Sequence, residues 1–218
     1  MGMTPLTEII IESGRAERAL SARQLEHLLE GGSGRRYGLV NRALKSNELF
    51  QVRRGLYVLA KKYRRYDIHP FVLAQQLLPG SYISAESALS FYGWIPEAVH
   101  TVLSVTPKGK SQTYQHDILG KFEYRRMTVN SGYFLQSVAR HELQHQVALI
   151  AKPLRALLDL VYLRKLPWQG LDFLLSGLRI DEQVFSTVTE LDITALLDVY
   201  KGKRERKFIG ELQRSLGL

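Results

Sequence analysis

Hydrophobic positions recur at helical spacing in the first part of the chain. Leu25, Leu28 and Leu29 form one apolar stripe, and Ser21 followed by Gln24 three residues later has the form of a capping box at a helix start. Residues 31–34 read Gly-Gly-Ser-Gly, and glycine loses more backbone entropy in a helix than alanine does. The pattern therefore predicts a helix that ends in a tight turn.

A second helical pattern starts at Arg35, with one apolar face and one basic face. Gly38, Asn41, Arg42 and Lys45 share the basic face at helical spacing. The inward-facing residues are Leu39, Val40, Ala43 and Leu44. Such a helix fits the major groove of DNA, where arginine pairs with guanine and asparagine with adenine. The candidate DNA-binding residues of this helix are Arg35, Arg36, Tyr37, Asn41, Arg42 and Lys45.

Two short β-prone runs follow, Leu49–Val52 and Leu56–Leu59. They flank Arg53, Arg54 and Gly55, and the glycine supplies the backbone freedom that a hairpin turn needs. The two arginines can reach a phosphate backbone or a minor groove and are added to the DNA-binding candidates. Helix, turn, basic helix and hairpin in this order predict a winged helix-turn-helix domain over residues 1–66.

The distribution of charge supports this interpretation. Residues 1–66 hold thirteen Lys/Arg and six Asp/Glu, a net charge of +7, whereas residues 67–218 hold seventeen and fifteen, a net charge of +2. Most of the basic excess of the chain therefore lies in the segment whose pattern predicts groove binding, as nucleic-acid binding requires.

The rest of the chain predicts a mixed α+β fold. Thr4-Pro5 starts the first helix, and the basic stretch Lys61–Tyr66 separates the N-terminal domain from a second domain over residues 67–218. Residues 67–150 are expected to form an α+β part and residues 151–218 a helical part. The expected helices are 71–78, 85–92 with Ser84 as its cap, and 154–163; the expected strands are 82–83, 99–106, 122–127, 133–139 and 143–150.

Three segments, in this order, resemble the AbiEi family of antitoxins and transcriptional regulators of type IV abortive-infection toxin–antitoxin systems. They read RRGLYVLA from Arg53, YISAESALSFYGWIP from Tyr82 and LIAKPLRALLDLVYL from Leu149. The resemblance implies an N-terminal winged helix that binds operator repeats upstream of its own operon. It also implies a C-terminal domain that opposes a nucleotidyltransferase-type toxin, with or without direct contact. Where the family often has Pro-Glu, this chain has Lys152-Pro153-Leu154-Arg155.

Two enzymatic alternatives come from short motifs. Residues 141–145 read HELQH, which on a helix can hold zinc with Glu142 as general base; alternation of His141, Leu143 and His145 suits a strand instead. Asp117 and Glu123 can hold a divalent cation in a metal-dependent nuclease. A second basic cluster spans residues 201–207 and is either a solvated helix start or a contact for nucleic acid or an acidic toxin surface.

Composition limits the remaining classes of function. The 218 residues include no cysteine, which excludes disulfides, thiolate metal sites and cysteine nucleophiles. Residues 1–13 lack the layout of a secretory signal, and no apolar run approaches the roughly 18 residues of a membrane span. We therefore expect a cytoplasmic, non-enzymatic regulator that binds double-stranded DNA without a cofactor, a metal or a membrane partner.

Overall fold

The structure is a computed structural model that describes residues 2–218, and the chain divides into two compact units. The first unit runs to Leu77 and also takes in Leu143–Gln146, and the second comprises Leu78–Glu142 and Val147–Leu218. The division falls later than residue 66, because the helix at Pro70–Leu77 groups with the first unit. Helices and two separate sheets confirm the mixed α+β class.

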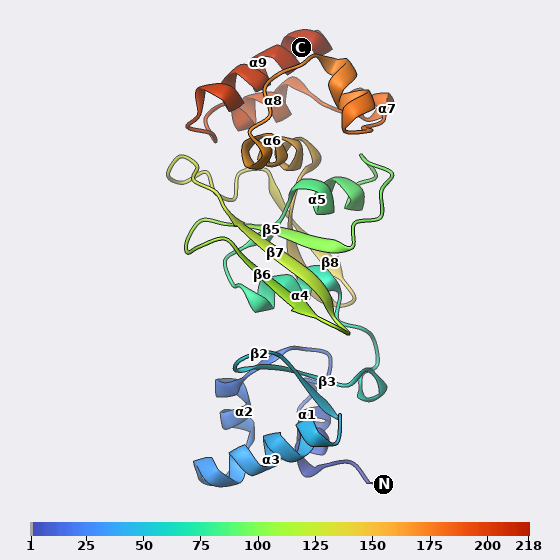
Figure 1. The fold of residues 1–218 in the computed structure, drawn as a ribbon, viewed down its shortest axis with the longest axis vertical. Coiled ribbons are helices and arrows are strands. Elements are labelled where there is room, and N and C mark those ends of the chain that lie inside the picture. Colours follow the sequence, from blue (N-terminus) through green and yellow to red (C-terminus); the bar gives the residue numbers. More distant parts are fainter. Residues whose placement is uncertain (1) are drawn as a thin grey trace. The chain divides into compact units, whose positions relative to one another are not determined.

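The first unit consists of short helices and a small antiparallel sheet (Figure 1). Its elements are α1 (Pro5–Glu12), β1 (Leu20–Ser21), α2 (Ala22–Leu28), α3 (Ser33–Lys45), β2 (Leu49–Arg53), β3 (Leu56–Leu59), the 3₁₀ turn Lys61–Tyr63 and α4 (Pro70–Leu77). The strand order is β1-β3-β2, with β3 antiparallel to both neighbours. The predicted helices and hairpin strands of this region are therefore confirmed.

One apolar cluster holds the first three helices and the sheet together. It includes Leu6 and Ile10 of α1, Leu25 of α2, and Leu39 and Ala43 of α3, all buried. Burial of each large aliphatic side chain stabilises the fold by about 1.5–3 kcal/mol. Because their helical spacing puts these residues on one face of each helix, the three helices share one core.

The start of α2 follows the prediction closely, whereas the start of α3 differs. The Ser21 hydroxyl accepts the Gln24 N–H at 3.2 Å, and the Gln24 side chain accepts the Ser21 N–H at 2.8 Å, which completes the capping box. Helix α3 begins at Ser33 rather than at Arg35. Of the three glycines between residues 31 and 34, only Gly31 takes the left-handed conformation, with φ 94°. The turn therefore requires a glycine at one of these three positions.

The second unit is built on a six-stranded sheet with the order β6-β7-β5-β4-β9-β8. The β4–β9 and β5–β7 pairs are parallel, and β4–β5 and β6–β7 are antiparallel. The strands are β4 (Tyr82–Ile83), β5 (Thr101–Thr106), β6 (Gln112–His116), β7 (Gly120–Arg126), β8 (Val138–Leu143) and β9 (Gln146–Ala151). The helices are α5 (Ala85–Phe91), α6 (Pro153–Arg164), α7 (Glu182–Phe185), α8 (Glu190–Leu197) and α9 (Lys203–Leu216), with a π-helical turn at Phe173–Gly177.

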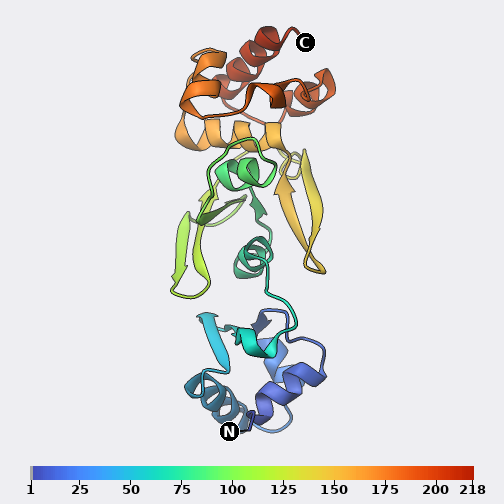
Figure 2. The same ribbon diagram turned by 90° about the vertical axis from the view of Figure 1, so that its right-hand side faces the viewer.

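Helix α6 is the centre of the second unit. It packs against α5 on one side and against α8 and α9 on the other, an arrangement visible in Figures 1 and 2. Every residue from Leu154 to Val161 is buried, including Arg155 and Asp159. A helix that is buried all round needs partners for its charged side chains, because an unpaired buried charge is strongly unfavourable.

Three predictions for the chain after residue 78 are wrong. Residues 133–137 form turns rather than a strand, and residues 143–150 do not form one strand, because a turn at Gln144 and His145 separates β8 from β9. Both turn residues have positive φ, 50° and 60°. Ser84 stands directly before α5 but makes no side-chain cap, and its hydroxyl is oriented toward Asp159, to which it donates. Strand β6 was not expected, because it lacks an apolar face.

None of the helices between residues 2 and 218 is long and apolar enough to cross a membrane.

Candidate nucleic-acid interface

Helix α3 is fixed to the core of the first unit by its apolar side and leaves its basic side free. Leu39 and Ala43 are buried, whereas Arg42 and Lys45 are exposed on the opposite face, next to the half-exposed Asn41. The helix has 13 residues and is therefore about 20 Å long, a length that can lie in the roughly 12 Å wide major groove.

The structure separates the predicted site residues of α3 into two groups. Arg35 lies seven residues before Arg42, so it extends the face of Asn41, Arg42 and Lys45. Arg36 and Tyr37 instead line a groove of about 290 Å³ between α2, α3 and Tyr57 of β3. Tyr37 is 72% exposed, so its ring extends from the rim of this groove into solvent.

The outer face of α3 also carries two glycines. Gly34 and Gly38 have no positive φ, and an added Cβ at either position would meet no atom within 4 Å. Glycine inside a helix costs roughly 0.5–1 kcal/mol relative to alanine. No contact with any of residues 2–218 explains why these positions lack a side chain, and a helix face without side chains lets a ligand approach the backbone.

The second basic element is the β2–β3 hairpin. Gly55 has φ 74° at its turn, and the Gly55 carbonyl accepts the Ala22 N–H at 2.8 Å, which ties the hairpin to the start of α2. Arg54 is exposed at the turn, and Arg53 is half-buried and donates to the Arg54 carbonyl at 3.4 Å. The hairpin therefore presents its cation at a position defined by the rest of the unit.

The cations of α3 and the hairpin share one property: none forms an ion pair with a carboxylate among residues 2–218. These cations are Arg35, Arg36, Arg42, Lys45, Arg53 and Arg54. By contrast, Lys61 of the same unit pairs with Asp67 at 2.7 Å. An uncompensated positive surface attracts polyanions and gives them a fast, salt-dependent association.

Glu48 holds the elements behind this surface in place. Its carboxylate accepts the Thr4 N–H at 2.9 Å and the Thr4 hydroxyl at 2.8 Å, which links the start of α1 to the segment between α3 and β2. Burial alone raises the pKa of Glu48, but hydrogen bonds from Thr7 and Thr4 outweigh it and the pKa lies below its usual range. The carboxylate is thus a fixed acceptor at neutral pH.

The HELQH segment does not form the helix that a zinc hydrolase needs. His141 lies on β8, and His145 is in the hairpin turn with φ 60°. The Nε2 atom of His141 lies 2.6 Å from the Tyr92 hydroxyl oxygen. Residues 2–218 contain no group of three or more His, Asp or Glu side chains placed to hold a metal ion. The prediction of a strand is correct for His141, whereas His145 lies in the turn after β8 and does not continue the alternation of inward and outward side chains along that strand.

The nuclease alternative also lacks its geometry. Glu123 of β7 pairs with Lys121 at 2.7 Å and with Arg125 at 2.9 Å. The hydrogen bond from Lys121 is the main reason that its pKa lies below its usual range. Asp117 is exposed in the turn between β6 and β7. The charge of Glu123 is therefore balanced within the sheet.

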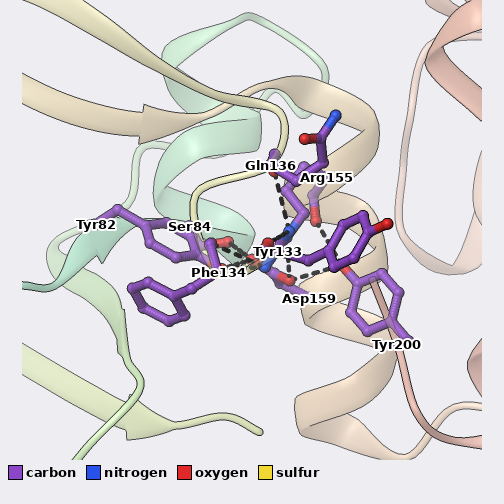
Figure 3. A network of polar contacts seen from close by, with 8 residues as sticks. All are labelled: Tyr82, Ser84, Tyr133, Phe134, Gln136, Arg155, Asp159 and Tyr200. Carbon is purple, nitrogen blue, oxygen red and sulfur yellow. Dashed lines mark hydrogen bonds and ion pairs between the residues drawn. The ribbon is translucent and has the colours of Figure 1, made fainter. Parts of the chain in front are cut away.

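A buried polar network in the second unit was not foreseen from the sequence (Figure 3). Asp159 of α6 accepts hydrogen bonds from the Tyr82 hydroxyl at 2.8 Å, the Ser84 hydroxyl at 2.6 Å and the Tyr200 hydroxyl at 2.7 Å. Arg155, one turn earlier, donates its Nε–H to Asp159 at 2.9 Å. The i, i+4 spacing of Arg and Asp was a signal for this pair, but the tyrosines lie too far away in the chain to be recognised.

The same arginine orders the turn that was predicted as a strand. Arg155 donates to the Gln136 carbonyl at 3.0 Å and to the carbonyls of Tyr133 and Phe134 at 3.4 Å, as Figure 3 shows. Burial, followed by the charge of Asp159, raises the pKa of Tyr82 and of Tyr200. Both tyrosines therefore keep their hydroxyl protons near neutral pH and donate them to Asp159, so the network ties α6 to β4 and to the segment before α9.

A scan against models of known protein families finds no match for this chain, and a search of curated proteins finds none either.

Proposed function

We propose that the first unit is a winged helix-turn-helix domain and that the protein is a sequence-specific DNA-binding transcriptional regulator. The order α1-β1-α2-α3-β2-β3 and the sheet order β1-β3-β2 support this proposal, because they place one basic helix and one basic hairpin beside each other on a shared core. In this plan α3 is the recognition helix and the β2–β3 hairpin is the wing.

The observation that carries the proposal is the set of six unpaired cations on α3 and the hairpin. A solvated face of an ordinary domain mixes both signs of charge, as in the Lys61–Asp67 pair. If all six cations neutralise phosphates, the logarithm of the binding constant falls with the logarithm of salt concentration with a slope of about −5. Asn41 and Arg42 have the side chains and the exposure to contact base edges.

The biological role that we propose is that of an antitoxin and autorepressor of a type IV abortive-infection system. The resemblance of residues 20–163 to the AbiEi family supports it, as do the basic helix and hairpin of the first unit. The partners would be operator repeats in double-stranded DNA upstream of its own operon and a nucleotidyltransferase-type toxin, in the cytoplasm. The second unit would then exert the antitoxic effect.

The proposal is tested by footprinting the full chain on the DNA upstream of its own gene. We expect protection of a defined sequence, and loss of that protection when Arg42→Ala is combined with Asn41→Ala. Arg18→Ala removes an exposed cation of the same unit outside α3 and the hairpin, and it should leave the footprint unchanged. Uniform protection of all DNA, or no protection at all, would refute sequence-specific binding.

The antitoxin role needs a separate experiment. Co-expression of the chain with the nucleotidyltransferase encoded beside it should restore growth that the enzyme alone stops. Asp159→Ala, which removes the acceptor at the centre of the buried network, should abolish this rescue, whereas the double variant Asn41→Ala/Arg42→Ala should lose the footprint and leave the rescue intact. Failure of the wild-type chain to restore growth would leave only the DNA-binding proposal.

A further inference from the structure

The second unit contains a concave basic surface that no part of the proposed function uses. It is a cleft of about 540 Å³ between the end of β7, the end of α6 and the start of α9 (elements labelled in Figure 1). We call it the basic cleft. It is lined by Ser111, Arg125, Arg126, Thr128, Tyr162, Leu163, Lys165, Lys201, Gly202, Arg204 and Glu205.

Five cations from three separate elements line this cleft together with one carboxylate, and one of the five, Arg125, is paired with Glu123 of β7 at 2.9 Å. Glu205 is 1% exposed and accepts the Arg204 guanidinium at 2.6 Å, so this carboxylate is already in use. Arg126, Lys165 and Lys201 have exposed side chains and form no ion pair with any carboxylate among residues 2–218. These three cations leave the cleft with an excess of positive charge, and a concave surface with such an excess attracts anions.

The walls of the cleft are held by hydrogen bonds rather than left flexible. The Arg126 N–H donates to the Ser111 hydroxyl at 3.1 Å, and the Thr128 N–H donates to the Tyr162 hydroxyl at 3.3 Å. Lys165 ends α6 with φ 55°, a left-handed position at which glycine is the favoured residue. The chain therefore keeps a lysine where its backbone conformation favours a residue without a side chain.

The size and chemistry of the basic cleft define the class of ligand. Pockets that hold small organic ligands have volumes of about 300–1,000 Å³. The side chains of Tyr162 and Leu163 add apolar surface beside the cations, which a bare inorganic anion does not need. Arginine and lysine are the residues that bind phosphate groups, and a base can pack against an aromatic side chain. We propose that the basic cleft binds a nucleotide through its phosphate groups.

This proposal does not depend on the DNA-binding role, and its test contains no duplex. Isothermal titration calorimetry of the full chain would use ATP, inorganic pyrophosphate, adenosine and a 5′-phosphorylated single-stranded hexanucleotide as separate probes. We expect ATP to bind, pyrophosphate to bind more weakly and adenosine not to bind. Binding of the hexanucleotide in place of ATP would assign the site to the end of a strand, with the same phosphate chemistry.

Two variants and one control test the location of the site. Lys165→Gly removes a cation and suits the left-handed backbone, so the fold should be retained, and Lys201→Ala removes a second cation. Each should weaken ATP binding roughly tenfold or more, since hydrogen bonds to charged groups are the stronger ones. Arg140→Ala removes an exposed cation of β8 outside the cleft and should change nothing. No binding of ATP, pyrophosphate or the hexanucleotide below about 1 mM, or an equal loss in Arg140→Ala, would overturn the proposal.

Discussion

Replacement of Gly38 by alanine should change stability and DNA binding in opposite directions. Gly38 lies inside α3 with a negative φ, and a methyl group at this position would meet no atom within 4 Å. Alanine therefore adds no clash in the free protein. Its higher helix propensity should raise the free energy of unfolding of the first unit by about 0.5–1 kcal/mol.

The same methyl group should weaken DNA binding if the outer face of α3 lies against base edges. An extra methyl group in a packed contact costs about 1–3 kcal/mol, which corresponds to roughly a fivefold to 150-fold loss of affinity. Thermal unfolding and fluorescence anisotropy on the duplex from the upstream footprint measure the two effects on the same sample.

Gly210 provides a matched control. It lies inside α9 of the second unit, and a Cβ there also meets no atom within 4 Å. Gly210→Ala should stabilise its own unit by a similar amount and leave DNA affinity unchanged. If Gly38→Ala stabilised the protein while its affinity for the duplex stayed at the wild-type value, the contact between this face of α3 and DNA would be excluded.

Three further predictions address readout, packing and pH. Arg42→Ala should relax base preference at one position of the duplex and cost about 1–3 kcal/mol of binding free energy. Arg54→Ala should instead weaken binding to all DNA sequences and reduce the slope of log binding constant against log salt concentration by about 1; affinities for a panel of single-base variants distinguish the two effects. Asp159→Ala should lower the free energy of unfolding of the second unit by about 3–5 kcal/mol, because Arg155 is left buried without its partner. Urea unfolding measures this change, and a decrease of less than about 1 kcal/mol would contradict the prediction. Burial lowers the pKa of His69 below 6.5, so the folded state binds a proton at this imidazole less well than the unfolded state does. The free energy of unfolding should therefore fall as pH decreases through 6.5, and it should fall less in His69→Asn; an identical pH profile in the variant would contradict the assignment.

Local signals in the sequence were sufficient for the first unit. The capping box at Ser21, the glycine at the hairpin turn and the 3.6-residue spacing of apolar positions each act over a few residues. They predict α2, α3 and the hairpin with small errors at the ends. The start of α3 was misplaced because Gly34, although a poor helix former, is held in the helix by the apolar face that follows.

Long-range contacts decided the features that the sequence did not reveal. The sequence around Ser84 predicts a side-chain helix cap, but in the structure the Ser84 hydroxyl donates a hydrogen bond to Asp159, 75 residues later, and caps no helix N–H. Arg155 has a structural role that the sequence did not reveal, since its guanidinium donates to three carbonyls of the turn at residues 133–136. The residues of the basic cleft are scattered from Ser111 to Glu205, and only the cluster at 201–207 was visible as a run of charge.

The central claim is that α3 and the hairpin read sequence in a DNA duplex. Its most direct test is the affinity of the full chain for the upstream duplex and for a scrambled duplex of equal length, each measured over a range of salt concentrations. We predict tighter binding of the upstream duplex by about 10³-fold or more, with slopes no steeper than about −5 for six cations. Equal affinity for the two duplexes at every salt concentration would contradict the claim.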